Sequence, residues 1–173
     1  ARTFIRRPAR HAARAAGRRP LVMRFPVIST WVATSLLLSL CHLAGYSPNS
    51  DLDDLLKLVE IRNFLQTGAW FDRAIPAILQ PEPFVSHWIR LVDLPYAAVA
   101  APLALLVGHE AALAFACYAV PLLLLLPAIY AFRRIVAALG FDQPNAAFFM
   151  SFLFMLPSLF EFAPDRIDYH NLE

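Results

Sequence analysis

The sequence predicts an all-α, polytopic integral membrane protein. Of its 173 residues, 59% are hydrophobic and only 16% are charged, and 14 prolines stand against five glycines. A soluble domain has about 45–50% apolar and about 25% charged residues, so the composition excludes an ordinary globular protein. Cys41 and Cys117 both lie in apolar stretches, where we expect small packing residues rather than a disulfide framework.

The charges are divided between two parts of the chain. Eight of the 15 basic residues precede residue 25, and no acidic residue precedes Asp51. Residues 1–24 therefore carry +8, and the other seven basic and 13 acidic residues leave −6. We predict that 1–24 is a basic cytoplasmic tail that meets anionic lipid headgroups. A mitochondrial transit peptide is the alternative, whereas the absence of an accompanying folded module argues against nucleic-acid binding.

The first apolar stretch predicts a membrane span over 26–45. The chain carries no charge from Phe25 to Tyr46, and about 20 helical residues at about 1.5 Å each cross the hydrocarbon core. Similar stretches predict further spans over 111–132 and 146–163. The stretch 94–108 has only about 15 residues, a length typical of a short or re-entrant helix.

Arg133 and Arg134 follow the span at 111–132 and should lie in the cytoplasm beside the tail. This requires the 94–108 helix to enter the membrane without crossing it. The loop 47–93 and the segment 165–173 then lie on the same outer side. If the 94–108 helix does cross, those two polar segments lie on opposite sides.

The outer loop 47–93 contains seven of the 13 acidic residues. Pro48-Asn49-Ser50 ends the preceding span, and the pattern after it predicts a helix over Asp51–Gln66 that is closed by Gly68. Asp54 falls on an apolar face of this juxtamembrane helix. Its carboxylate should therefore be partly desolvated unless a cation neutralises it.

Two acidic clusters border the spans, and each has two interpretations. At the start of the loop helix, carboxylates cap the helix and interact favourably with its dipole. After the last span, polar residues can form a solvated helix end. Alternatively, both clusters bind Mg²⁺ or Mn²⁺, which take carboxylate oxygens and bridge to substrate phosphate. The clusters are Asp51, Asp53 and Asp54, and Asp165, Asp168, His170, Asn171 and Glu173.

Several motifs follow one another at characteristic spacings. Asp53-Asp54 opens the loop helix, Gly68 follows 15 residues after Asp53, and Trp70-Phe71 comes next. The segment Pro81–Pro95, the arginine-ended stretch Phe132–Arg134 and, after a span, Asp168-Tyr169-His170 complete the order. Over roughly 28–173 this order resembles the N-terminal region of the membrane-embedded GT-C glycosyltransferases. The resemblance is closest to the catalytic subunit of oligosaccharyltransferases and to the protein mannosyltransferases. His170 departs from the oligosaccharyltransferase pattern, which has an acid there.

The resemblance implies an enzyme of the cell (inner) membrane, of which this chain would be the N-terminal part. Such an enzyme transfers a sugar or glycan from a polyprenyl-phosphate-linked donor to an acceptor on the extracytoplasmic face, assisted by Mg²⁺ or Mn²⁺. The implied catalytic residues are Asp53, Asp54 and Asp168. The implied metal ligands are Asp53, Asp54, Asp168, His170 and Glu173. The implied phosphate-binding residues are Arg90, His87 and Arg166.

Two alternatives remain beside this expectation. Instead of meeting a phosphate, Arg90 can be a juxtamembrane cation that extends its charged end to the membrane surface, paired there with Asp93. The whole chain can belong to a non-enzymatic polytopic protein, either a transporter or an assembly subunit. Transporters place ionisable residues at mid-membrane, often in repeated halves. Here the acids cluster at the ends of the spans and no internal repeat is visible, which favours the enzyme.

Overall fold

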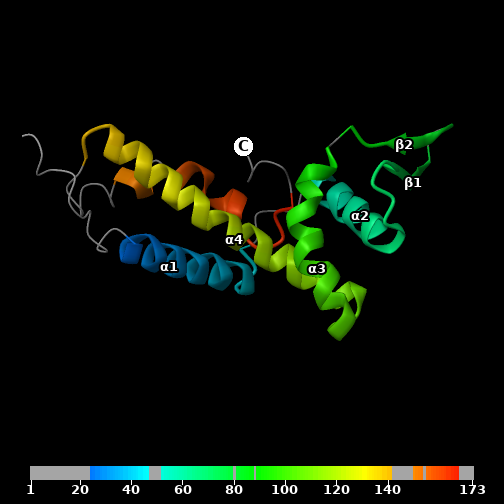
Figure 1. Cartoon of the computed structure of the whole chain (residues 1–173), viewed down its shortest axis with the longest axis horizontal. Helices are drawn as coiled ribbons and strands as arrows, with labels where there is room; N and C mark the ends of the chain where they lie inside the picture. The colour runs from blue at the N-terminus through cyan, green and yellow to red at the C-terminus, as the bar shows by residue number, and fades with distance from the viewer. Residues whose placement is uncertain are drawn as a thin grey trace, which may run out of the picture.

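The computed structural model describes residues 24–46, 52–79, 81–87, 89–141, 150–153 and 155–167. The elements are α1 (Arg24–Leu43), α2 (Leu52–Thr67), β1 (Ala74–Leu79), β2 (Pro83–Val85), the 3₁₀ helix η2 (Arg90–Asp93), α3 (Leu94–Val107), α4 (His109–Ala138) and the 3₁₀ helix η3 (Leu156–Phe162). The described chain is mostly helical and elongated. α4 runs through its length, with α1 beside one end and α2, α3 and the strands at the other (Figure 1).

Within the described residues, two helical segments are long and apolar enough to cross a membrane: the 18 residues Arg90–Val107 and the 30 residues of α4. α3 matches the helix expected over 94–108, and η2 runs directly into it, so the continuous helical segment is longer than the expected stretch of about 15 residues. Polar residues can extend this helix because their charges are paired inside the protein, as described below. In α1, the predicted first span, the apolar part Val27–Leu43 is shorter than either segment.

α4 contributes residues to two apolar cores. Its N-terminal half packs with α2, α3 and Ile167, and its C-terminal half packs with α1 and η3. Ala100, Ala112 and Ala116 are fully buried in the first core, and such small side chains allow helix backbones to approach closely. Only Gly108 separates α3 from α4, and its φ of +84° is a conformation that glycine adopts without steric cost.

The prediction of an all-α chain is wrong at residues 74–85. There β1 and β2 form an antiparallel hairpin in which Ala74 lies opposite Val85 and Ile75 opposite Phe84. Isoleucine, phenylalanine and valine favour strands, and Pro76 cannot donate the hydrogen bond that a helix interior needs. The predicted helix over 146–163 also differs. It ends as the 3₁₀ helix η3 with Pro157 in its first turn, and residues 142–149 lie outside the described ranges.

α2 agrees with the predicted loop helix to within one residue at each end. Gly68 ends it at φ +67° and donates its N–H to the carbonyl oxygen of Phe64 at 2.8 Å. The face that α2 turns toward the protein carries charged residues, whereas Leu52 and Leu55 on its outer side are 70% and 51% exposed. A helix at a water-facing surface has the opposite arrangement. The outer face of α2 therefore suits contact with lipid.

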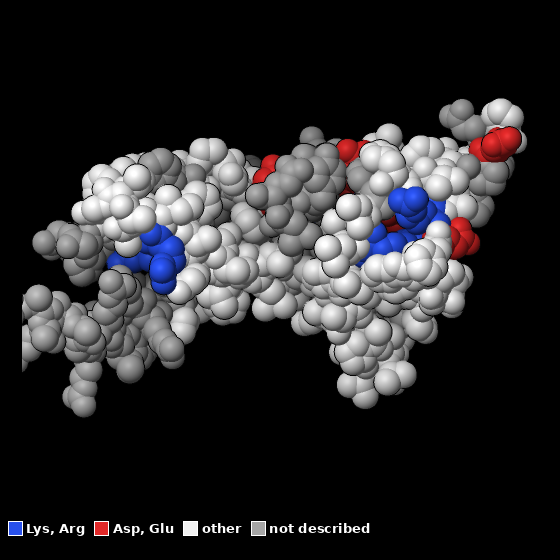
Figure 2. All heavy atoms as spheres, turned by 45° about the horizontal axis from the view of Figure 1, so that its top comes forward, with Lys and Arg blue, Asp and Glu red and all other residues white. Residues whose placement is uncertain are grey.

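α1 and the C-terminal half of α4 run antiparallel. Val27, near the start of α1, and Arg133, near the end of α4, line one cavity, whereas the ring of His42 at the end of α1 meets the ring of Tyr118 edge-on at 5.8 Å. The start of α1 therefore lies at the same end of the molecule as Arg133 and Arg134. Figure 2 shows basic side chains in two separate groups, one at this end and one among acidic side chains over α2 and the hairpin.

Candidate functional site

An ion pair joins the two acidic segments of the sequence. Asp54, in the first turn of α2, is 1% exposed. Its Oδ2 accepts a hydrogen bond from Arg166 Nη1 at 3.0 Å, and its Oδ1 accepts one from the Ile167 N–H at 2.8 Å. A buried carboxylate needs such partners to offset its lost hydration. The expected desolvation of Asp54 is confirmed, and Arg166 is the cation that neutralises it.

Further hydrogen bonds hold the segment around Arg166 against α3 and α4. The Tyr96 hydroxyl donates to the Arg166 carbonyl oxygen at 3.2 Å, and Arg166 Nη2 donates to Glu161 Oε2 at 2.8 Å. The Asp165 N–H donates to the Cys117 carbonyl oxygen at 3.2 Å. In a regular helix that carbonyl bonds the N–H four residues on, but Pro121 occupies this position and has no N–H. Because Pro121 has no N–H, the Cys117 carbonyl oxygen can accept the hydrogen bond from Asp165 that anchors this segment.

Replacing Pro121 by alanine should weaken this anchor. The alanine N–H would compete with Asp165 for the Cys117 carbonyl oxygen. One hydrogen bond contributes about 0.5–1.5 kcal/mol net, so we expect the Asp165 amide to exchange roughly threefold to tenfold faster. Hydrogen exchange of the full-length protein followed by mass spectrometry measures this. Pro127→Ala, at the other proline inside α4, is the control and should leave the exchange rate of the peptide containing Asp165 unchanged. Equal exchange in the wild type and Pro121→Ala would contradict the anchor.

A cavity of about 290 Å³ lies beside Asp54 between α2 and α4. This volume is close to that of the smallest ligand pockets, which hold about 300 Å³. Both charged and apolar residues line it. Among the charged ones, Arg62 Nη2 is paired with Glu110 Oε2 at 2.8 Å. The described lining residues are Asp54, Leu55, Leu58, Arg62, Glu110, Leu113, Ala114, Cys117, Asp165 and Ile167. The cavity thus combines apolar surface, three carboxylates and one guanidinium.

A second charged cluster is buried where α2 meets η2. Lys57 Nζ lies 2.6 Å from Glu60 Oε2 and 3.2 Å from Asp93 Oδ1, and Arg90 Nη1 lies 3.0 Å from Asp93 Oδ2. Each of the four residues is at most 5% exposed, and the two positive charges balance the two negative ones.

Arg90 extends this cluster to the loop that precedes the hairpin. It donates to the carbonyl oxygens of Glu60, at 3.1 Å, and Asp72. Its guanidinium also lies over the Phe64 ring, 5.6 Å from the centroid. Arg90 therefore ties α2, η2 and this loop together. The pair with Asp93 is observed, but Arg90 is buried and does not extend its charge to the surface as the alternative expected.

The structure describes five of the predicted site residues. Asp53 is half-buried in the first turn of α2, and His87 is exposed between β2 and η2. Asp54, Arg90 and Arg166 form the internal ion pairs described above. Asp51, Asp168, His170 and Glu173 lie outside the described residues. Among the described residues, no three His, Cys, Asp or Glu side chains are grouped to hold a metal ion.

Sequence reasoning missed two parts of this region. Arg62, the basic residue in the described lining of the cavity, was not among the expected phosphate ligands. The cluster of Lys57, Glu60 and Asp93 was also missed. The shared stripe of Lys57 and Glu60 on the loop helix was a usable signal for their pair, because residues three apart on a helix are neighbours. Comparisons with family models, curated proteins and solved structures gave no match.

Proposed function

We propose that the chain forms part of a membrane glycosyltransferase of the GT-C type. It would transfer a sugar or glycan from a polyprenyl-phosphate-linked donor to an acceptor on the extracytoplasmic face. The observation that supports this is the bonding of Asp54 to Arg166 and to the Ile167 N–H. It joins the helix that carries Asp53 to the segment that continues in sequence to Asp168. These are the two acidic motifs on which the resemblance depends.

In this proposal Asp54 is a positioning residue, because both of its oxygens are already bonded. The described residues alone do not fit a metal ion, so the proposed ligands are Asp53 together with Asp168, His170 or Glu173. A bound Mg²⁺ or Mn²⁺ would neutralise charge on the leaving phosphate.

The proposal gives the phosphate contact to Arg62 rather than to Arg90 or Arg166. The latter two are at most 8% exposed. Arg62 is also paired with a carboxylate, that of Glu110, but its side chain is 39% exposed and lines the cavity. A guanidinium offers a phosphate two parallel hydrogen bonds. The apolar floor formed by Leu58, Leu113 and Ala114 suits the adjoining part of a lipid-linked donor.

The proposed setting is the inner membrane, with the N-terminus in the cytoplasm. In the part of the chain that the structure describes, two segments have the length and composition of membrane spans. The start of α1 and the Arg133–Arg134 pair lie at one end, as the positive-inside rule favours for a cytoplasmic side. The exposed leucines of α2 lie at the other end, where an outer juxtamembrane helix would meet lipid.

Removing the carboxylates of the joined segments tests the proposal. We expect Asp53→Asn and Asp168→Asn in the full-length protein each to lower kcat/KM by about a hundredfold or more, the size of effect found on losing one transition-state contact. The measurement is transfer of a radiolabelled sugar from a polyprenyl-phosphate-linked donor, with and without a chelator. Glu82→Gln, on the exposed hairpin turn, is the matched control. Wild-type activity in both aspartate variants, or no transfer by the wild-type protein, would overturn the proposal.

A further inference from the structure

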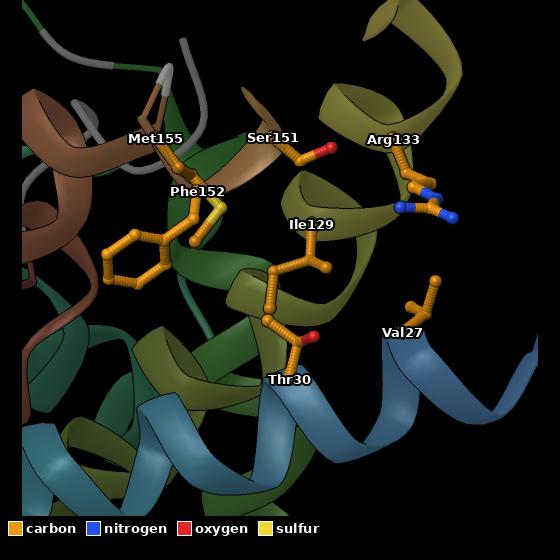
Figure 3. Close-up of a pocket in the computed structure, with 7 residues that line it drawn as sticks. All are labelled: Val27, Thr30, Ile129, Arg133, Ser151, Phe152 and Met155. Carbon is orange, nitrogen blue, oxygen red and sulfur yellow. The ribbon is translucent and has the colours of Figure 1, made fainter. Parts of the chain in front are cut away.

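Three segments of the chain run between the same two ends of the molecule. The first end is a small cavity that residues of all three segments line together: Val27 of α1, Arg133 of α4 and Ser151 (Figure 3). At the second end, the ring centroid of His42 lies 5.8 Å from that of Tyr118, and His42 Nε2 lies 3.4 Å from Asp165 Oδ2. α1, the C-terminal half of α4 and the segment from Ser151 to Asp165 therefore each extend from the first end to the second.

The helix from Arg90 to Val107 does not connect these two ends. Asp54, which precedes it in the chain, is bonded to Arg166 at the second end. α4, which follows it after Gly108 alone, passes Tyr118 at that same end before it continues to the first. α3 shares a core with the N-terminal half of α4, whereas α1 and η3 pack on the C-terminal half. The chain therefore enters and leaves this helix at the second end, although the helix has the length of a membrane span.

Helix length places the turn between α3 and α4 at the membrane surface. In α4 no charged residue stands between Glu110 and Arg133. About 20 helical residues at about 1.5 Å each match the hydrocarbon core, and counted back from Arg133 they end at Leu113. Glu110, just beyond, has a side chain that is 66% exposed. Gly108 lies about 7 Å beyond Leu113, within the headgroup layer that adds about 5–8 Å on each side.

The last residues of α3 form an exposed apolar tip at this turn. Leu105 and Leu106 are 87% and 82% exposed, and Val107 is 53% exposed. The sequence carries no charged residue between Asp93 and Glu110, and the charged residues at the start of the helix are buried in ion pairs. Aliphatic side chains are unfavourable in water, whereas they are readily buried at the boundary between lipid headgroups and acyl chains.

We infer that the α3 tip, Leu105–Val107, inserts into the outer leaflet of the bilayer as an interfacial anchor, and that α3 does not cross the membrane. A lipid surface is favoured over a protein partner because the tip lies at the depth of the headgroups. It also adjoins the part of α4 on which Phe115 and Leu123 are about half exposed. The anchor keeps Glu110, and with it the cavity beside Asp54, at the level of the headgroups. The inference rests on the proposed membrane setting and is independent of glycosyl transfer.

Quenching by spin-labelled lipids tests the depth of the tip. The full-length protein with Leu106→Cys, and with Cys41 and Cys117 replaced by alanine, carries a thiol-linked fluorophore in nanodiscs. The lipids bear a nitroxide either on the headgroup or at the end of the acyl chain. We expect the headgroup nitroxide to quench at least about twofold more strongly, because interfacial side chains are buried only about 5–10 Å deep. Leu106 is exposed, so its replacement should leave the fold intact.

Two further positions calibrate the measurement. Leu36→Cys, on the exposed face in the middle of α1, is the deep control and should be quenched more strongly by the acyl-chain nitroxide. Glu82→Cys, on the exposed hairpin turn, is the control for water and should be quenched little by either. In sealed vesicles, His109→Cys, directly after the turn, should react with a membrane-impermeant maleimide from the same side as Glu82→Cys.

The outcomes separate the anchor from its alternatives. Reaction of His109→Cys and Glu82→Cys from opposite sides, or stronger quenching of Leu106→Cys by the acyl-chain nitroxide, would show that α3 crosses and would overturn the inference. Quenching of Leu36→Cys without quenching of Leu106→Cys would place the tip in water or against protein, which also overturns it. If neither position is quenched, the membrane setting itself is wrong, so the two failures are distinguishable.

Discussion

Asp54→Ala is expected to destabilise the full-length protein by about 3–5 kcal/mol, the cost of leaving one member of a buried ion pair without its partner. Arg166 would keep its bond to Glu161 but lose the carboxylate that is 3.0 Å away, and the Ile167 N–H would lose its acceptor. The segment that leads toward Asp168 would separate from α2. Glycosyl transfer should therefore fall together with stability.

A double variant distinguishes the effect of charge from the effect of side-chain volume at the Asp54–Arg166 pair. Asp54→Leu combined with Arg166→Met removes both charges while keeping side-chain volume, and apolar replacement of a whole buried pair is often neutral or stabilising. We expect it to recover most of the stability lost in Asp54→Ala. Arg62→Gln breaks the exposed pair with Glu110 and should cost no more than about 1 kcal/mol. Chemical unfolding in detergent measures all three. If Asp54→Ala lowered the stability as little as Arg62→Gln does, Asp54 and Arg166 would not form a buried ion pair.

Asp93→Ala is expected to cost a similar amount, about 3–5 kcal/mol, because it leaves two buried cations without their shared carboxylate. Asp93 Oδ1 contacts Lys57 Nζ and Asp93 Oδ2 contacts Arg90 Nη1. Lys57 would keep its contact with Glu60, and Arg90 would keep its hydrogen bonds to the carbonyl oxygens of Glu60 and Asp72. The contact between α2 and the helix that starts at η2 should loosen first.

Hydrogen exchange can locate this loosening. In Asp93→Ala we expect faster exchange in α2 and in the loop around Asp72, whose carbonyl accepts from Arg90, before any change at the α1 end of α4. Glu110→Gln, at an exposed pair, is the control for charge removal. Uniform acceleration along the whole chain, or none, would show that the cluster does not connect these elements.

The local features of the outer loop could be predicted because they depend on neighbouring residues. The 3.6-residue period and Gly68 predicted α2 to within one residue at each end. The same period placed Asp54 on an apolar face, from which the need for a neutralising cation followed. The hairpin was missed because its short apolar stretch, Ala74–Leu79, is interrupted by proline and resembles a loop in sequence.

The partners of the buried charges could not be predicted in the same way. Arg166 is 112 residues from Asp54, and Asp93 is 36 residues from Lys57. Many cations in the sequence could have neutralised Asp54, and the resemblance pointed to Arg90 and Arg166 as phosphate ligands instead. The extension of α3 through η2 depends on these same pairs, because Arg90 and Asp93 form its first turn and are buried.

Composition and local patterning were enough to establish an apolar helical chain, the separation of its charges and the start and end of the loop helix. These properties follow from the preferences of residues close together in the sequence. Only the folded chain could assign Asp54 to Arg166, Arg90 to Asp93 and Arg62 to the cavity. Each assignment depends on which helices pack together. A buried charge needs a partner of opposite sign, and only the packing decides which distant residue lies close enough to supply it.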